Sequence, residues 1–384
     1  MAVLTADWVS NEATQRVCAV LNDAGFQVYF VGGCVRNALL GAPVNDIDLA
    51  TDARPETVTE LMAAAGFKVV PTGIEHGTVT VIASHIPHEI TTFRRDIETD
   101  GRRAVVAFSD NIDEDARRRD FTMNALYCAP DGAIIDPLDG MPDLKARRVR
   151  FIENAEQRIK EDYLRILRFF RFHAWYGDPA GGLDGEGLAA IAENLDGLAQ
   201  LSAERVGAEI KKLLLADDPA PAVAAMRATG VLARIFSGCE DRALAPLVHL
   251  EGENGVAPDA MRRLAVLGVG DVGDTLCLSR AQMKRLLAYQ TGLETMQPAH
   301  ALGYRLGVEI AQGVLLLRAA VFETPLAEGA FDEAARGAAA VFPVKAADLM
   351  PEFSGVALGN KLRALEDAWI EGKFELTREQ LLRA

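Results

Sequence analysis

The chain has 384 residues, of which 49% are hydrophobic and 25% are charged, a composition that favours globular folding and excludes a disordered chain. At about 150 residues per domain, this length predicts two or three domains. The formal net charge of -15 disfavours a nucleic-acid partner on average, but nine basic and four acidic residues between Lys145 and Arg171 make a local positive patch. We expect any polyanion site to lie there.

The ends of the chain and its cysteines bear on its location. The N-terminal segment lacks the basic start and apolar run of a signal peptide, and no stretch reaches about 18 uncharged apolar residues. The five cysteines are scattered and never form a CxxC motif, which argues against a disulfide framework and a zinc cage. We therefore expect a cytoplasmic protein that binds no membrane, and the sequence predicts no protein partner.

Strand-like segments separated by Gly, Pro and Asp turns fill residues 27 to about 140. In chain order they are QVYFVGG, DIDLAT, FKVV, GTVTVIAS, HEITTF, AVVAF and AIIDPL. Beyond about residue 150, Ala, Leu, Arg and Glu recur at helical spacing. The sequence therefore predicts an α+β fold, in which a small mixed β-sheet flanked by helices is followed by an all-helical region.

Two local patterns in the helical half are interpreted as structural. Ser279 with Gln282 three residues later forms a candidate capping box at the start of a helix. Residues 268–273 match GxGxxG, but helical patterns rather than a strand precede and follow them. We interpret this segment as a loop between helices and not as a dinucleotide site.

A strand over residues 28–31 is expected to run into Gly32 and Gly33 and then into a helix over residues 34–40. Such a turn offers free N–H groups and the positive end of a helix dipole to a phosphate, and Arg36 can add a charged clamp. A double-glycine turn alone is weak evidence, because most such turns are only tight turns.

Asp46 and Asp48 alternate around Ile47 on the next expected strand, so their carboxylates point to one face. Carboxylates this close repel each other, and divalent cations such as Mg²⁺ resolve the repulsion; two such ions can clamp the attacking and leaving oxygens of a phosphoryl transfer. Glu89, on a third expected strand, can add a carboxylate. The alternatives are a solvated strand end for the two aspartates and an ordinary charged edge residue for Glu89.

GGxVR followed by DxD is the signature of the DNA polymerase beta type nucleotidyltransferases, and the chain resembles the class II branch of that superfamily. The later runs RRRDFTMNAL, IIDPLDGMPDLKARRVRFI and QRIKEDYLRILRFFRF extend the resemblance over residues 28 to 215. That branch comprises CCA-adding tRNA nucleotidyltransferases and bacterial poly(A) polymerases.

The resemblance implies a set of site residues and a cofactor. Asp46 and Asp48 are implied to hold Mg²⁺, and with Glu89 we take them as the catalytic residues. The implied nucleotide contacts are Gly33, Arg36, Arg119, Asp162, Arg165, Arg168 and Arg171. One departure is Asn37, because most relatives carry Asp after the Arg. Asn has no charge, so we assign it no metal role.

A charged stripe recurs every three residues from Asp162 to Arg171 on an expected helix. Aromatic residues of the same segment are expected to anchor it in a core: Phe169, Phe170, Phe172 and Trp175. An acceptor beside a guanidinium is complementary to the edges of cytosine and adenine, whereas guanine and uracil present a carbonyl to the acceptor. Asp162 and Arg165 are thus predicted to select CTP and ATP, with Arg168 and Arg171 facing the triphosphate. The alternative is a solvated charged face.

The activity that the resemblance implies is template-independent addition of C, C and A to the 3′ end of tRNA, using CTP and ATP and releasing pyrophosphate. A catalytic head (residues 1–145), a helical neck (146–215) and a helical body and tail (216–384) that bind the tRNA acceptor arm are expected. The similarity of EDYLRILRFFRF to CCA-adding members favours this activity. Poly(A) addition, partial CC or A addition, and a non-catalytic RNA-binding relative stay open.

The connection from residue 94 to residue 115 carries several arginines and acids between two strand-like runs. By the same resemblance, this connection is expected to include a flexible loop, around residues 100–103, that helps the site to switch from C to A. The alternative is a solvated hairpin.

Overall fold

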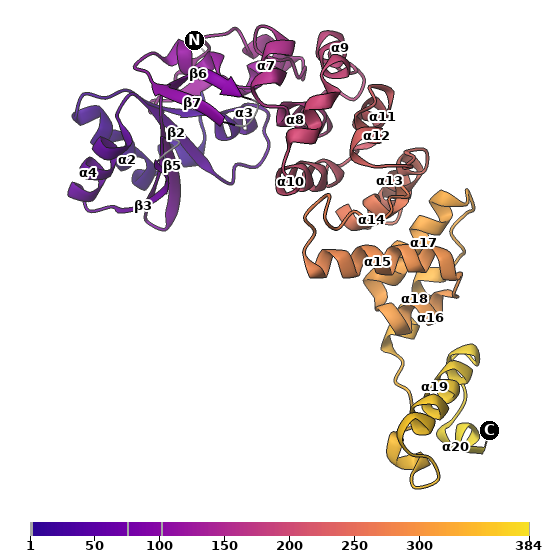
Figure 1. The fold of residues 1–384 in the computed structure, drawn as a ribbon. Helices are drawn as coiled ribbons and strands as arrows, with labels where there is room; N and C mark the ends of the chain where they lie inside the picture. The colour runs from indigo at the N-terminus through magenta and orange to yellow at the C-terminus, as the bar shows by residue number, and fades with distance from the viewer. Residues whose placement is uncertain (1–2, 75–76, 101–102, 384) are drawn as a thin grey trace. The chain divides into compact units, whose positions relative to one another are not determined.

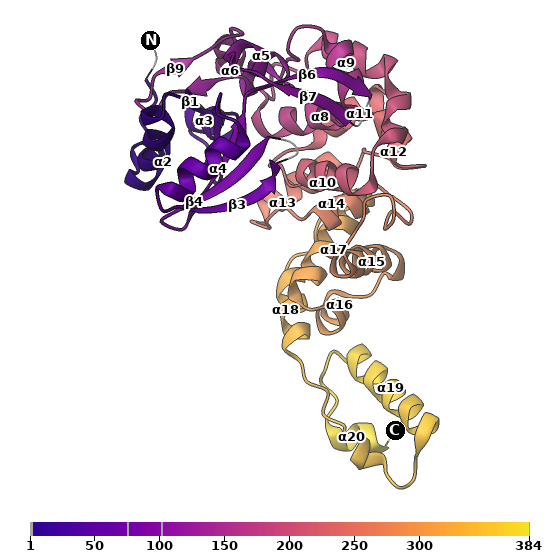
Figure 2. The same ribbon diagram turned by 60° about the vertical axis from the view of Figure 1, so that its left-hand side comes forward.

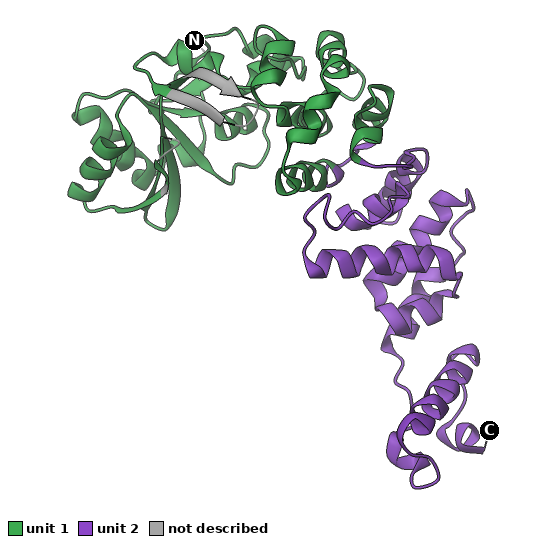
Figure 3. Cartoon of the chain, viewed as in Figure 1, with its two compact units in different colours: residues 1–213, 221–235 green, residues 214–220, 236–384 purple. Residues whose placement is uncertain are grey.

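The computed structural model describes residues 3–74, 77–100 and 103–383, which form two compact units (Figures 1 and 3). Unit 1 comprises residues 1–213 and 221–235, and unit 2 comprises residues 214–220 and 236–384. None of the helices in the described ranges combines the length and the apolar character that a membrane span requires. The cysteines are all free thiols, as their scatter along the sequence predicts.

Unit 1 is built on a seven-stranded sheet with the order β3-β4-β5-β2-β1-β8-β9. Its strands are β1 (Val28–Val31), β2 (Ile47–Thr51), β3 (Lys68–Gly73), β4 (Thr78–Ala83), β5 (Ile86–Thr92), β8 (Tyr127–Cys128) and β9 (Ile134–Ile135). Strands β2 and β5 run parallel, with Asp48 opposite Glu89, and the other neighbours are antiparallel. The sheet is therefore mixed, as predicted.

A separate antiparallel pair is formed by β6 (Arg94–Asp100) and β7 (Arg103–Phe108). The sequence predicts β7 from the apolar run AVVAF but does not predict β6, because most residues of RRDIETD are charged. It also misses β8, which has only two residues. Residues 101 and 102, within the loop expected to assist the switch from C to A, lie outside the described residues, so that expectation stays a prediction.

Helices pack around the sheet, and the described elements that follow β9 are all helices (Figures 1 and 2). The helices of the first 235 residues are α1 (Asp7–Ser10), α2 (Glu12–Asp23), α3 (Gly33–Leu39), α4 (Pro55–Ala64), α5 (Ile112–Arg117), α6 (Met141–Lys145), α7 (Ala155–Glu161), α8 (Leu164–Tyr176), α9 (Gly185–Glu193), α10 (Ala203–Leu214), α11 (Ala220–Ala228) and α12 (Val231–Ile235). Helices α2 and α4 lie against β4 and bury Val17, Leu21 and Met62 there. This burial fixes the position of the strands that carry the acidic residues.

Helix α8 is anchored by its aromatic residues, but not by all those expected. Phe169, Phe170 and Phe172 are buried, and Phe169 stacks on Phe151 from the segment before α7 with ring centroids 5.4 Å apart. The expectation for Trp175 is wrong, since its side chain is 47% exposed. Its indole N–H needs a partner and finds the backbone carbonyl of Lys212 at the edge of the unit, 2.8 Å away.

The described residues of unit 2 form helices joined by loops, with no strand among them. Its helices are α13 (Leu244–Glu253), α14 (Ala260–Val266), α15 (Arg280–Thr295), α16 (Ala299–Leu306), α17 (Val308–Val321), α18 (Ala330–Ala339), α19 (Gly355–Glu371) and α20 (Arg378–Arg383). The capping box of Ser279 and Gln282 begins α15, as predicted. Residues 268–273 form the predicted loop between α14 and α15.

A fully buried ion triad ties α13 to α14 in unit 2. Glu251 accepts hydrogen bonds from Arg262 Nε at 2.7 Å and from Arg263 Nε at 2.8 Å. Arg263 also donates through Nη1 to the backbone carbonyl of Leu214 at 2.8 Å. The triad therefore holds Leu214, the last residue of α10, as well as the two helices.

We predict that Glu251→Ala lowers the free energy of unfolding by about 3–5 kcal/mol, because it leaves two buried guanidinium groups without a carboxylate. Chemical denaturation followed by circular dichroism measures this change. The matched control is Glu253→Ala on the same helix, whose carboxylate is exposed and is expected to change stability by less than about 0.5 kcal/mol. Equal effects of the two substitutions would contradict the prediction.

Candidate active site

The double-glycine turn joins β1 to α3 and lies beside an arginine from the RRRD run. Gly32 has φ +72°, a conformation that glycine adopts without strain. A Cβ atom on Gly32 would lie 3.5 Å from Arg119 Nη1, and one on Gly33 would lie 3.8 Å from Arg36 Nη2. The start of α3 therefore meets two of the arginines that the sequence singles out.

Three acidic residues lie near one another where β2 begins. Asp48 and Glu89 are register partners on the parallel strands β2 and β5, and Asp46 immediately precedes β2. Burial and then the Glu89 carboxylate raise the pKa of Asp48 to about 6, and Asp46 adds to the rise. Arg119 and Arg36 act in the opposite direction on this pKa. The structure thus brings together the predicted acids and two of the predicted arginines.

The acids at this edge offer carboxylate oxygens, the ligand type that hard divalent cations take. Within residues 3–74, 77–100 and 103–383, no group of three or more His, Cys, Asp or Glu side chains could hold a metal ion. Mg²⁺ is usually bound through one or two carboxylates, together with water and substrate phosphates. Asp46 and Asp48 offer that set, because their negative charges lie close together and burial makes the charge on Asp48 costly.

Arg36 is held between α3 and α8 instead of projecting into solvent. Its guanidinium donates to Asn124 Oδ1 and, from Nε and Nη2, to Asn37 Oδ1 at 3.1 and 2.8 Å. It lies over the rings of Tyr176 and Phe172, 4.0 and 5.0 Å from their centroids. Burial lowers the pKa of Arg36, against the pull of nearby Tyr176. These contacts fix the guanidinium in one place.

Arg119 is held by a buried acid that the sequence analysis did not single out. Asp115 Oδ2 accepts from Arg119 Nη2 at 2.9 Å and from the Tyr127 hydroxyl at 2.7 Å, and Asp115 Oδ1 pairs with Arg118. Burial opposes ionisation of Asp115, but Arg119 and Arg118 outweigh it and hold the pKa of Asp115 well below its usual range. The carboxylate stays charged and orients Arg119 toward the turn at Gly32.

Asp162 does not lie on the same helix as the arginines of its stripe. The single helix expected over this segment is wrong, because α7 ends at Glu161 and α8 starts at Leu164, with Asp162 extended between them. Asp162 Oδ1 accepts the Leu164 N–H at 3.1 Å, a local turn that competes with a continuous helix. Asp162 Oδ2 accepts from Arg205 Nη2 of α10 at 2.6 Å.

Arg165 bonds to groups other than Asp162. Its Nη1 donates to Glu161 Oε2 at 2.7 Å and to the backbone carbonyl of Arg158 at 2.9 Å, and its Nη2 donates to the carbonyl of Arg118 at 2.8 Å. Asp162 and Arg165 are therefore oriented separately, each by its own partners.

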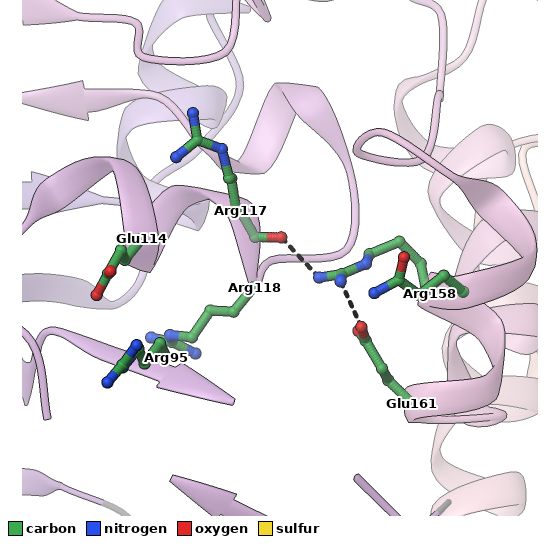
Figure 4. A pocket seen from close by; sticks show the side chains of 7 residues that line it. Arg95, Glu114, Arg117, Arg118, Arg158 and Glu161 are labelled. Atoms are coloured by element: carbon green, nitrogen blue, oxygen red, sulfur yellow. Dashed lines mark hydrogen bonds and ion pairs between the residues drawn. The ribbon is translucent and has the colours of Figure 1, made fainter. Parts of the chain in front are cut away.

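An arginine-lined cavity of about 340 Å³ adjoins Glu161 (Figure 4). Its walls are Arg95, Glu114, Arg117, Arg118, Gln157, Arg158 and Glu161. Figure 4 shows the Arg158 guanidinium between the backbone carbonyl of Arg117 and the Glu161 carboxylate. Glu161 thus links the cavity wall to Arg165, on α8.

Arg168 and Arg171 project from α8 onto acids of other segments. Arg168 Nη2 lies 2.6 Å from Asp120 Oδ2, and Arg171 bonds to Glu209 of α10. Sequence analysis missed Asp120 and Glu209, although one signal was present for the second. Glu209 falls at the helical spacing of the buried residues of α10, and a buried acid at such a position needs a cation.

The positive patch between residues 145 and 171 contains arginines with acidic partners, an exposed pair of Lys160 with Glu156, and an exposed strip. The exposed basic strip consists of Lys145, Arg147, Arg148 and Arg150. Arg148 and Arg150 both form ion pairs with the buried Asp143, at 3.1 and 2.8 Å. Arg147 is exposed and has φ +49°, so the backbone turns at the centre of the strip. This strip is the surface that can reach a polyanion.

Two family models match separate parts of the chain. Residues 28–150 match the family model of the poly A polymerase head domain, and residues 183–242 match that of a probable RNA and SrmB-binding site of polymerase A. The CCA tRNA nucleotidyltransferase 1, mitochondrial, of Danio rerio is 33% identical over 377 residues, which cover 93% of this chain and 86% of that protein. This chain belongs to the CCA tRNA nucleotidyltransferase family.

Coverage differs among members of the family. The Mus musculus protein of the same name is 44% identical over 192 residues, so this chain spans 44% of that protein's length while half of the chain is matched. The solved structure of the Bacillus stearothermophilus CCA-adding enzyme in complex with CTP has a TM-score of 0.77 and 29% identity, and the match covers 97% of this chain and 95% of that one. The family and the fold class predicted from the sequence are confirmed.

We predict that Asp48→Asn stabilises the metal-free protein in EDTA by about 1–2 kcal/mol near neutral pH. The pKa of Asp48 is raised to about 6 in the folded protein, against about 4 in the unfolded chain. The Asp48 carboxylate therefore lowers the free energy of unfolding as the pH rises from about 4 to above 6. The advantage of the variant should therefore shrink below about pH 6 and vanish near pH 4.

Urea denaturation of both proteins across this pH range measures the difference. Asp46→Asn is the control, because Asp46 is exposed and its substitution should change stability much less. A variant no more stable than the parent protein at neutral pH would contradict the prediction.

Proposed function

We propose that this protein adds C, C and A to the 3′ end of tRNA, using CTP and ATP and releasing pyrophosphate. The observation that carries the proposal is the meeting of Asp46, Asp48 and Glu89 with Arg36 and Arg119 beside the double-glycine turn. This arrangement provides carboxylates for a divalent cation next to fixed positive charge for a triphosphate. Membership of the CCA tRNA nucleotidyltransferase family supports the choice of tRNA as the acceptor.

In the proposed reaction, the tRNA 3′-hydroxyl attacks the α-phosphate of CTP or ATP. A bond forms between O3′ and the α-phosphorus, the bond from that phosphorus to the bridging oxygen breaks, and pyrophosphate leaves. Asp46 and Asp48 would hold Mg²⁺, which when bound supplies Lewis-acid stabilisation of the charge that develops on the phosphate oxygens. Glu89 adds a third carboxylate beside Asp48.

The chain's own groups orient the triphosphate in this proposal. The free N–H groups at the start of α3, from Gly33 onward, and the end of the helix dipole favour a phosphate there. Arg36 and Arg119 are already fixed by Asn124 and Asp115, so little conformational freedom is lost when a nucleotide binds. Arg168 and Arg171 complete the set from α8.

Base selection is proposed to rest on Asp162 and Arg165. A fixed carboxylate accepts from the amino group of cytosine or adenine and repels the carbonyl that uracil or guanine presents at that edge. Arg165 donates to the adjacent ring nitrogen. No nucleic-acid template is needed, because the protein itself supplies the complementary edge.

The helical body and tail over residues 216–384 are proposed to hold the acceptor arm of tRNA, by its shape and phosphates rather than by its base sequence. The exposed basic strip of unit 1 supplies further phosphate contacts. We place this activity in the cytoplasm, where the free cysteine thiols stay reduced.

Asp46→Ala and Asp48→Ala are each expected to abolish incorporation of both C and A while the protein stays folded. The physical reason is that each change removes a ligand from one shared metal site. Labelled CTP and ATP with tRNA that lacks its 3′ end measure the activity, and circular dichroism checks the fold. Sequencing the product ends separates CCA addition from poly(A) or partial addition.

Loss of only one of the two activities would rule out a single catalytic centre. A parent protein that incorporates neither nucleotide, yet binds tRNA, would instead support a non-catalytic RNA-binding protein.

Binding of tRNA is expected to weaken as salt rises despite the net charge of -15, because local cations set counterion release. Arg147→Ala should reduce the slope of log affinity against log salt by about 1, since it removes one exposed phosphate contact. Arg147 is a cleaner choice than Arg148, whose loss would also unpair the buried Asp143. An unchanged slope would place the RNA elsewhere.

A further inference from the structure

Helix α10 presents two charged residues, one helical turn apart, to the segment that carries the proposed nucleotide contacts. Arg205 pairs with Asp162, and Glu209 pairs with Arg171 and lies 3.8 Å from Arg168. Figures 1 and 2 both show α10 beside α8. Residues four apart on a helix share a face, so one face of α10 contacts both ends of the proposed nucleotide site.

Arg205 donates one of the two hydrogen bonds that orient the Asp162 carboxylate. One carboxylate oxygen, Oδ1, accepts the Leu164 N–H at 3.1 Å, and the other, Oδ2, accepts from Arg205 Nη2 at 2.6 Å. Asp162 lies in extended backbone between α7 and α8, so no helix packing holds its side chain. With both oxygens bonded, the plane of the carboxylate is fixed and its remaining lone pairs face a constant direction.

We propose that Arg205 is a positioning residue for base selection, an inference that rests on the proposed function of Asp162. Rejection of uracil and guanine requires an acceptor that cannot turn away from their carbonyl oxygen. Without Arg205, the carboxylate can rotate about its hydrogen bond to Leu164, and a water molecule can enter and donate to that carbonyl. Arg205 then acts through Asp162 and not on the base.

Glu209 plays a separate part on the same helix face. It is buried, and its carboxylate lies against two arginines that are proposed to face the triphosphate, a group that all four nucleotides share. A change at Glu209 is therefore expected to alter the KM for CTP and UTP alike. A change at Arg205 is expected to alter their ratio.

The test compares kcat/KM for CTP against UTP on tRNA lacking its CCA end, and for ATP against GTP on tRNA ending in CC. Arg205→Ala should lower each preference by about tenfold, the usual effect of losing one hydrogen bond to a charged group. Arg205→Lys keeps the positive charge but loses the planar guanidinium group. Its nucleotide preferences should therefore lie between those of the parent protein and those of Arg205→Ala. Lys212→Ala is the matched control, because it removes one positive charge from the exposed side of the same helix.

Equilibrium binding of CTP and UTP to the same variants gives a readout that does not need catalysis. If the parent protein prefers CTP in binding but adds no nucleotide to tRNA, the proposed function fails while the role of Arg205 can still be measured. Thermal unfolding checks each variant, and Arg205→Gln replaces Arg205→Ala if the latter does not fold.

Preferences that stay within about twofold of the parent value in Arg205→Ala would overturn the inference. So would a loss of tRNA affinity with unchanged base preference, since that result would make Arg205 a phosphate contact. Lys212→Ala relaxing the preference equally would show that only the charge of α10 matters.

Discussion

Three arginines beside the site in unit 1 lie against carboxylates, one of them four residues away and two of them on distant segments of the chain. Asp115 holds Arg119, Asp120 holds Arg168, and Glu209 holds Arg171. Desolvating an ion is expensive, so removing one partner of such a pair costs about 3–5 kcal/mol. The pairs therefore do two things at once, because they keep charged groups in a packed region and fix the direction of each guanidinium before any ligand arrives.

The acids at the start of β2 differ from these ion-paired acids. In the ranges that the structure describes, neither Asp46, Asp48 nor Glu89 forms an ion pair with a lysine or an arginine. Burial, followed by the neighbouring carboxylates of Glu89 and Asp46, raises the pKa of Asp48 to about 6. Of the two nearby arginines, Arg119 pairs with Asp115 and Arg36 bonds to the amide oxygens of Asn124 and Asn37. The arginine pairs therefore stabilise the structure, whereas the acids proposed to hold the metal lie apart from those pairs.

Sequence patterns predicted the groups of the site better than their partners. Asp46, Asp48 and Glu89 could be placed together because strand alternation and chemistry both show in the local sequence. Arg205 and Asp120 could not be assigned as partners, since the contacts of Asp162 and Arg168 cross 43 and 48 residues of chain and no local period encodes them. The same holds for β6, whose charged residues conceal its strand character. Fold class follows from periodicity, whereas the pairing of charges depends on tertiary packing.

Asn37, which carries no charge, connects Arg36 to the loop that leads to the acids of β2. Its Oδ1 accepts from Arg36, and its Nδ2 donates to the backbone carbonyl of Pro43 at 2.8 Å. An aspartate could accept from Arg36 but has no N–H for Pro43. Pro43 lies in the loop that leads from α3 into Asp46, so Asn37 ties the position of Arg36 to the start of the acidic strand. At this position, which departs from the family pattern, Asn37 therefore links the arginine proposed to face the triphosphate to the acids proposed to hold the metal.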